Sequence, residues 1–154
     1  PEPAAAPLPE PPRSRGETVL VAEDEKSIRE LTVRVLERLG YRVLAAEDPS
    51  QAIELAEQYG AVIHLLITDV IMPGMNGRDL ANRLKTLHPG LRTLYMSGYT
   101  ADVIAHHGVL NEGVLFVQKP FSVHDIAVKV RVALDSQNKA RRDPRKAATR
   151  ALSG

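Results

Sequence analysis

Acidic side chains close two apolar segments of the chain, and carboxylates in such places can bind cations or act as nucleophiles. Asp69 ends the segment that begins at Ile63, and the pair Glu23-Asp24 follows the apolar residues 19–22. Short apolar runs of this kind are typical of buried β-strands. In an alternating α/β sheet the carboxyl ends of the strands form one edge, where ligands bind. We therefore expect the three carboxylates to meet there.

Three carboxylates in one place need a counter-charge, because close like charges cannot all stay ionised cheaply. A hard divalent cation meets this need, and Mg²⁺ suits a few carboxylates together with waters and a phosphoryl oxygen. Simpler interpretations exist for each part alone. Asp69 alone would be a loop cap, and Glu23-Asp24 alone would be an acid pair that favours the amino end of a helix dipole. The combination favours a cation site.

Two further apolar segments end in groups that can contact an anion. Ser97 follows the apolar residues 94–96, and Lys119 comes after the residues 114–117 and before Pro120. A serine hydroxyl can donate a hydrogen bond, and a lysine ammonium brings a positive charge with three donors. The alternative for Lys119 is a solvated loop lysine, which its place after an apolar strand makes less favoured.

Four successive strand ends thus carry an acid pair, an Asp, a Ser and a Lys-Pro pair, in this order. This order resembles the receiver domain of two-component response regulators, and the resemblance extends over residues 18–136. It implies an α/β fold of the flavodoxin-like type, a (βα)5 three-layer sandwich with a parallel sheet in the order 2-1-3-4-5. It also implies a phosphoacceptor function in two-component phosphorelay signalling.

The resemblance assigns roles to the residues that could bind a phosphoryl group. Asp69 would be the phosphoacceptor, taking the group from a phosphohistidine. Lys119, aimed by a cis bond to Pro120, and the Ser97 hydroxyl would contact the phosphoryl oxygens. Phe116 would be the aromatic switch residue, and Ser97 would take part in the same switch. The alternative role for Phe116 is plain core packing. The domain would then catalyse its own phosphorylation and dephosphorylation, and the parent chain could itself be a histidine kinase.

The resemblance also implies a metal, Mg²⁺, with Mn²⁺ as an alternative and no other cofactor. Asp24 and Asp69 would bind it directly, the backbone carbonyl of Ile71 would add a third ligand, and Glu23 would act through water. Many receivers carry Asp at the place of Glu23, so we expect the longer side chain to change the affinity for the metal.

Five strands and five helices must alternate to position these groups, and alternation of this kind implies a parallel sheet covered on both faces. Apolar runs and helical spacing predict strands at 18–23, 41–46, 63–67, 91–96 and 114–117, and helices at 25–39, from Asp48 or Ser50 to Tyr59, from Asn76 or Gly77 to Leu87, at 101–107, and after Ser122.

The two ends of the chain differ from its centre in composition. Residues 1–17 are rich in Pro and Ala and predict a disordered linker, while residues 137–154 hold six Lys or Arg against one Asp and predict a disordered basic tail. Nucleic-acid binding by that tail is the weaker alternative, because no aromatic residue interleaves the charges. Between them, residues 18–136 form the predicted receiver domain.

The composition excludes several classes of protein. The chain of 154 residues contains no cysteine, so disulfides and thiolate metal sites are excluded. No apolar run has the length of a membrane span, and no signal peptide is visible. We expect a cytoplasmic domain, or the cytosolic part of a membrane-bound kinase, with no membrane or nucleic-acid contact of its own.

Two functional alternatives remain beside the phosphoacceptor. A pseudo-receiver would bind without phosphotransfer, but it would not need the full set of acids, Ser and Lys. A phosphatase of the haloacid dehalogenase type needs a second Asp where this chain has Ile71. The chain starts with Pro, so we expect a piece of a longer protein. The segment 94–100 resembles receivers on hybrid histidine kinases, which favours a receiver at the end of such a kinase over a stand-alone regulator. The partner would be a kinase phosphotransfer domain or a histidine phosphotransfer protein.

Overall fold

Five parallel strands form one sheet in a computed structural model that describes residues 10–98 and 114–141. Their spatial order is β2-β1-β3-β4-β5, which confirms the predicted order and the flavodoxin-like fold. The strands are β1 (Thr18–Ala22), β2 (Arg42–Ala46), β3 (Ile63–Asp69), β4 (Arg92–Ser97) and β5 (Phe116–Gln118). The predicted strands agree with them to within two residues at each end.

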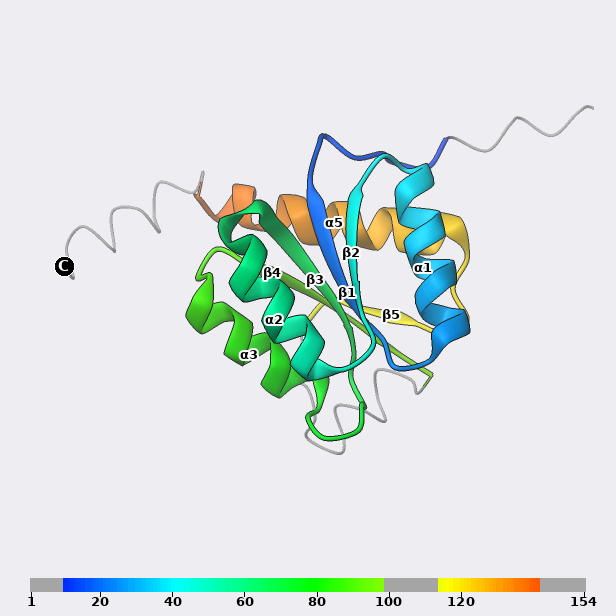
Figure 1. Cartoon of the computed structure of the whole chain (residues 1–154). Helices are drawn as coiled ribbons and strands as arrows, with labels where there is room; N and C mark the ends of the chain where they lie inside the picture. Colours follow the sequence, from blue (N-terminus) through cyan, green and yellow to red (C-terminus); the bar gives the residue numbers. More distant parts are fainter. Residues whose placement is uncertain (1–9, 99–113, 142–154) are drawn as a thin grey trace, which may run out of the picture.

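Helices cover both faces of this sheet, as Figure 1 shows. α1 and α5 pack on one face, and α2 and α3 pack on the other, each pair with its own apolar cluster. The helices are α1 (Lys26–Arg38), α2 (Pro49–Tyr59), α3 (Gly77–Leu87) and α5 (Val123–Arg141), and a short 3-10 turn, η1 (Gly60–Val62), precedes β3. The predicted helix at 101–107 lies outside the described residues.

The two apolar clusters follow from the period of the central strands. Successive side chains of a strand point to opposite faces, so alternate residues belong to different layers. In β1, Val19 and Val21 join the α1–α5 cluster, and Leu20 and Ala22 join the α2–α3 cluster. All four are fully buried. A parallel strand with both faces covered therefore reads as an unbroken apolar run.

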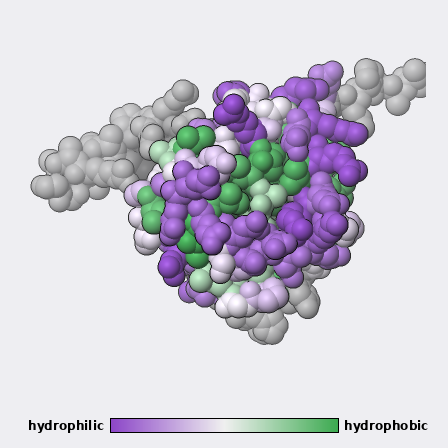
Figure 2. Space-filling view, viewed as in Figure 1, coloured by the Kyte–Doolittle hydropathy of each residue, from purple (hydrophilic) through white to green (hydrophobic). Residues whose placement is uncertain are grey.

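The sheet ends at β2, an edge strand whose covering is incomplete. Val43 and Leu44 are only partly buried, and Ala45 is exposed. Figure 2 shows hydrophobic side chains gathered over this strand, between the polar surfaces of α1 and α2. A groove beside it is lined mostly by charged side chains of α1, including Arg29, Arg34 and Glu37, and charged borders of this kind protect an edge strand from pairing with other chains.

Side-chain caps fix where three helices begin. The Asp48 carboxylate accepts a hydrogen bond from the Gln51 backbone N–H at 2.7 Å, so Asp48 and not Ser50 caps α2. Asn76 accepts from the backbone N–H of the third residue of α3 at 2.8 Å. Ser122 caps α5 as predicted, accepting from the Asp125 N–H at 3.0 Å. Caps of this type each contribute about 1 kcal/mol to stability.

The boundaries of the domain differ from the sequence prediction at both ends. The backbone N–H of Ser14 donates to the Leu39 carbonyl at 2.8 Å, and Glu17 forms an ion pair with Arg131. The prediction of disorder for 1–17 is therefore corrected for 14–17, because polar contacts hold this segment without apolar burial. The predicted boundary at residue 136 falls inside α5, whose backbone stays helical to residue 141. No helix in the described ranges is long and apolar enough to cross a membrane.

Candidate functional site at the carboxyl edge of the sheet

The sheet brings the four predicted strand ends to one edge. Asp69 is the last residue of β3 and Ser97 the last residue of β4, while Glu23 directly follows β1. In the strand register Asp69 lies beside Met96, and Ser97 lies beside Gln118, so Lys119 comes one residue after the paired part of β5. The predicted convergence of these side chains is thus present in the fold.

The three carboxylates form one cluster. Oxygen atoms of Glu23, Asp24 and Asp69 all lie within 4.8 Å of one another. Their surroundings differ sharply, because Glu23 is 1% exposed and Asp69 is 9% exposed, whereas Asp24 lies on the surface. A cluster that runs from the interior to solvent can receive an ion from solution and hold it with hard oxygen ligands.

Lys119 supplies the positive charge of the cluster. Its Nζ donates to Glu23 Oε2 at 2.8 Å and to Asp69 Oδ2 at 2.9 Å. Its backbone N–H donates to the Ser97 carbonyl at 2.8 Å, and its bond to Pro120 is cis, as predicted. The side chain is only 13% exposed. Backbone and side chain therefore both fix the ammonium between the two carboxylates.

Burial and hydrogen bonding have opposite effects on the pKa values of Glu23 and Lys119. Burial and the nearby Asp69 charge raise the pKa of Glu23, although the Lys119 hydrogen bond partly opposes this. Burial also disfavours the charged form of Lys119, but its hydrogen bonds to Glu23 and Asp69 outweigh burial and raise the lysine pKa. Lys119 is therefore a cation throughout the physiological pH range.

Arg29 organises the acidic segment, and the sequence analysis missed it. Its guanidinium donates to the Glu23 carbonyl at 2.9 Å and more weakly to the Asp24 carbonyl at 3.4 Å. The Glu23 carboxylate also accepts from the Glu25 N–H at 3.2 Å. A basic residue close to the amino end of a helix is unfavourable to the helix dipole. That unfavourable placement is the signal that could have pointed to a local partner.

Gly77 lets α3 pack directly against the end of β3. A Cβ atom built at Gly77 would overlap the Asp69 backbone oxygen, and it would lie 3.0 Å from the Asp69 carbonyl carbon and 3.1 Å from Thr68 Cγ2. The Gly77 N–H donates to the Val70 carbonyl at 2.8 Å. The glycine therefore fixes the backbone that carries Asp69, a role that the sequence analysis missed because it assigned Gly77 only to the start of a helix.

In the loop after Asp69 the side chain of Ile71 turns outward, whereas those of its neighbours Val70 and Met72 are buried. Ile71 is 54% exposed, and its backbone N–H lies 3.4 Å from Asp69 Oδ1. The apolar side chain therefore has no place in the acidic cluster, and Ile71 can contribute to the site only through its backbone. The metal contact through the Ile71 carbonyl, which the resemblance implies, stays a prediction.

Ser97 and Phe116, the two predicted switch residues, lie on the neighbouring strands β4 and β5. Ser97 is 1% exposed at the end of β4. Phe116 pairs with Tyr95 in the register and is partly buried against the apolar cluster of α2 and α3. Phe116 is thus neither a fully buried core residue nor a surface residue.

A groove of about 460 Å³ opens beside Lys119. It runs between α1 and the loop that joins β5 to α5, and its apolar lining comes from both sides. Its lining residues are Glu25, Ile28, Leu31, Gly98, Lys119, Pro120 and Phe121. Leu31 is 48% exposed. The acidic cluster therefore borders an apolar surface that a second molecule could cover.

Comparison with known proteins supports the resemblance to a receiver domain. The sequence model of the response regulator receiver domain family matches residues 19–131. The sensor kinase CckA of Brucella abortus is 35% identical over 121 residues, which are 79% of this chain and 13% of that protein. The response regulator receiver protein CpdR of the same organism is 29% identical over 112 residues, which are 73% of this chain and 92% of CpdR.

A solved structure agrees in fold and sequence. The crystal structure of the receiver domain from the hybrid histidine kinase CckA superimposes with a TM-score of 0.64 at 33% identity, over 76% of this chain and 98% of that chain. The chain corresponds to a small part of the sensor kinase and to nearly all of CpdR. With its sheet order, its acidic cluster and its matched residues, the chain belongs to the response regulator receiver domain family.

Proposed function

We propose that Asp69 accepts a phosphoryl group from a phosphohistidine of a partner protein. The observation that carries this proposal is the position of its carboxylate, 2.9 Å from the Lys119 ammonium and within 4.8 Å of two further carboxylates. The chain belongs to the receiver domain family, and a phosphoacceptor role is the one that this family implies for such a cluster. A carboxylate at a partly open edge is also a competent nucleophile for phosphorus.

The transfer balances as a displacement at phosphorus. An Asp69 oxygen forms a bond to phosphorus while the bond from phosphorus to the histidine nitrogen breaks, and the electron pair leaves with the imidazole. The product is an acyl phosphate on Asp69. Lys119 stays beside the reacting oxygens and offsets their negative charge, which is the main catalytic demand of phosphoryl transfer. The Ser97 hydroxyl would donate a hydrogen bond to a phosphoryl oxygen.

The donor set of the cluster fits Mg²⁺, with Mn²⁺ as an alternative. Asp24 and Asp69 would hold the ion directly, the Ile71 carbonyl would add a ligand, and Glu23 would act through water. Carboxylate oxygens within 4.8 Å of one another support this assignment. When bound, the ion supplies positive charge that neutralises the phosphoryl oxygens.

The groove beside Lys119 supports a protein as phosphodonor. A phosphohistidine must reach Asp69 from the open edge, and the apolar surface next to that edge includes the exposed Leu31 together with Ile28 and Phe121. An apolar strip of this kind suits an amphipathic helix of a histidine kinase or of a histidine phosphotransfer protein. The similarity to CckA favours a hybrid histidine kinase as the parent protein, and the similarity to CpdR supports a stand-alone regulator as the alternative. Either would place this domain in the cytoplasm.

Labelling with an acyl phosphate tests the acceptor. The whole chain, incubated with Mg²⁺ and radiolabelled acetyl phosphate, should take up label that is stable in acid and released by alkali. Asp69→Asn preserves the size of the side chain but removes the nucleophile, so it should abolish labelling. Asp79→Asn, at an exposed position of α3, is the matched control and should label like the wild type. Equal labelling of Asp69→Asn and the wild type would place the acceptor elsewhere.

A further inference from the structure

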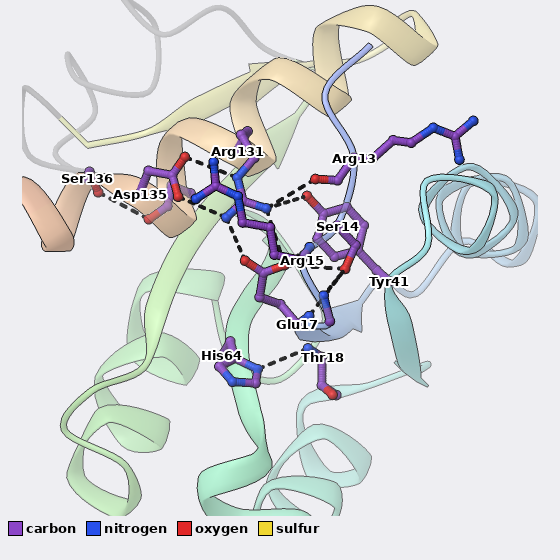
Figure 3. A network of polar contacts seen from close by, with 12 residues as sticks. Arg13, Ser14, Arg15, Glu17, Thr18, Tyr41, His64, Arg131, Asp135 and Ser136 are labelled. Atoms are coloured by element: carbon purple, nitrogen blue, oxygen red, sulfur yellow. Dashed lines mark hydrogen bonds and ion pairs between the residues drawn. The ribbon is translucent and has the colours of Figure 1, made fainter. Parts of the chain in front are cut away.

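A second charged cluster lies away from the carboxyl edge of the sheet, where β1 begins. Arg131, in the middle of α5, is 13% exposed and holds two carboxylates at once. Its NH2 lies 2.5 Å from Glu17 Oε2 and 2.8 Å from Asp135 Oδ1, and its Nε donates to Asp135 Oδ2 at 3.1 Å. Figure 3 shows this group of three residues, which we call the Arg131 clasp.

The clasp fastens the segment 13–17, which precedes β1. Arg131 NH1 also donates to the Arg13 carbonyl at 3.3 Å. Within the segment, the Gly16 N–H donates to Ser14 Oγ at 2.8 Å and the Arg15 N–H donates to Glu17 Oε1 at 2.6 Å. These bonds fold the segment into a compact turn around the Glu17 carboxylate. The turn therefore depends on the same carboxylate that binds α5.

The same segment is also tied to the end of α1. The Ser14 N–H donates to the Leu39 carbonyl at 2.8 Å, and the Arg13 guanidinium lies 3.3 Å from the Arg38 carbonyl. The last carbonyls of a helix have no partners within the helix and favour cationic groups. Segment 13–17 thus bridges the end of α1 and the middle of α5.

The charges of the clasp remain in place over a wide pH range. Burial alone would raise the pKa of Glu17, but the Arg131 guanidinium outweighs burial and lowers that pKa to about 2. Hydrogen bonds from Arg131 also hold the pKa of Asp135 below its ordinary value. Bidentate guanidinium–carboxylate pairs are among the strong and directional hydrogen bonds of proteins. The clasp is therefore a fixed connection and not a pH switch.

The amino end of α5, at Val123, follows closely after Lys119 of the candidate active site. Lys119, which contacts Asp69, is followed by Phe121, which packs against the apolar cluster shared with Ile126 and Val130 of α5. From Val123 to Arg131 the helix rises by about 12 Å. The loop after Lys119 and the helix α5 together therefore connect the residue that contacts the Asp69 carboxylate with the residue that holds segment 13–17.

We propose that the Arg131 clasp makes segment 13–17 and α5 a single mechanical unit, which couples the state of the Asp69 site to the chain that precedes β1. Segment 13–17 of this chain occupies a surface that is formed by the middle of α5 and the end of α1. If a ligand at Asp69 changes the stability of the clasp, linkage requires that the clasp changes the affinity for that ligand by the same factor. The ligand part of this proposal rests on the proposed function.

Amide hydrogen exchange of the whole chain tests the proposal. Ser14, Gly16 and Glu17 should exchange about ten-fold faster in Glu17→Gln than in the wild type, because the variant loses the ionic contact while keeping the side-chain size. Glu10→Gln makes the same chemical change at an exposed position of the same stretch and should have no effect. Mg²⁺ with beryllofluoride, a phosphoryl mimic, should change exchange at 14–17 about five-fold in the wild type and leave Glu17→Gln unchanged there.

Three results would overturn it. Equal exchange at 14–17 in the wild type and in Glu17→Gln would show that no clasp forms. A response to beryllofluoride at 69–71 with no response at 14–17 would show fastening without coupling. If residues 69–71 do not respond either, the proposed function fails. The coupling can then be tested without any ligand in the variant Lys119→Met, which perturbs the chain at the start of α5. Unchanged exchange at 14–17 in that variant would refute the coupling independently.

Discussion

Replacing Gly77 by alanine should disturb both stability and the site, because the added methyl has no room. A Cβ there would overlap the Asp69 backbone oxygen and approach Thr68 Cγ2 to 3.1 Å. The obstacle is backbone, which no rotamer change can move. Either α3 shifts away from β3, or the end of β3 that carries Asp69 is displaced. Both outcomes weaken the hydrogen bond from the Gly77 N–H to the Val70 carbonyl, now 2.8 Å long.

The size of the effect follows from the separate contributions. Overpacking of a well-packed site costs about 1–3 kcal/mol. A buried N–H left without a partner costs about 1–3 kcal/mol more. Alanine is favoured over glycine in a helix by about 0.5–1 kcal/mol, which offsets part of the loss. We therefore expect Gly77→Ala to lower the free energy of unfolding by about 2–4 kcal/mol.

Urea unfolding followed by circular dichroism measures this change, and Gly90→Ala is the matched control. A Cβ at Gly90 would meet nothing within 4 Å, and its φ is not in the left-handed region. That substitution should be neutral or should stabilise by about 0.4–1 kcal/mol through the unfolded chain. A loss of less than about 0.5 kcal/mol in Gly77→Ala would refute the argument that this contact fixes the backbone of Asp69.

Three further predictions concern charge, metal and coupling. The Glu17 pKa of about 2 lies below its ordinary value of about 4.3. The contribution of the ionised Glu17 to the free energy of unfolding is therefore present above pH 5 and is lost as the pH falls towards 2. After solvent screening, the wild type should lose about 1 kcal/mol more than Glu17→Gln between pH 6 and pH 3 in urea unfolding, and equal losses would contradict the ion pair. Mg²⁺ titration should shift the amides of residues 22–25, 69–72 and 119, and Asp24→Asn should weaken binding about ten-fold or more, whereas shifts confined elsewhere would rule out this site. Ser97→Ala should keep Asp69 phosphorylatable but reduce the beryllofluoride-induced amide shifts at 114–134, and a full response there would remove Ser97 from the coupling.

The residues of the acidic cluster were predictable because each lies next to a strong local signal. Asp69 and Lys119 follow apolar runs that are strands, and parallel strands in an alternating fold bring their carboxyl ends together. The sequence therefore indicates which groups meet, although it does not indicate their distances. That Lys119 contacts both Glu23 and Asp69 depends on how the loop after β5 is held by the Ser97 carbonyl.

The features that escaped prediction depend on contacts between distant or backbone groups. Glu17 and Arg131 are 114 positions apart, and each looks like an ordinary surface charge in its local context. Proline-rich composition indicated a linker up to residue 17, because composition records the absence of apolar burial and not the presence of an ion pair. The continuation of α5 past Ser136 was missed for a related reason, since its last turns lack the apolar period that marks a packed helix.

The two anchors of Lys119 give the site a property that neither carboxylate could supply alone. If Asp69 accepts a phosphoryl group as proposed, the oxygen that accepts the hydrogen bond from Lys119 no longer belongs to a free carboxylate. Glu23, fully buried and fixed by the Glu25 N–H, is a second acceptor for Lys119, at 2.8 Å. Lys119 therefore has one carboxylate partner that takes no part in the proposed transfer, and this partner favours its charged form beside the arriving phosphoryl group. Positioning of this kind, set before the reaction, is what makes an electrostatic contact effective in catalysis.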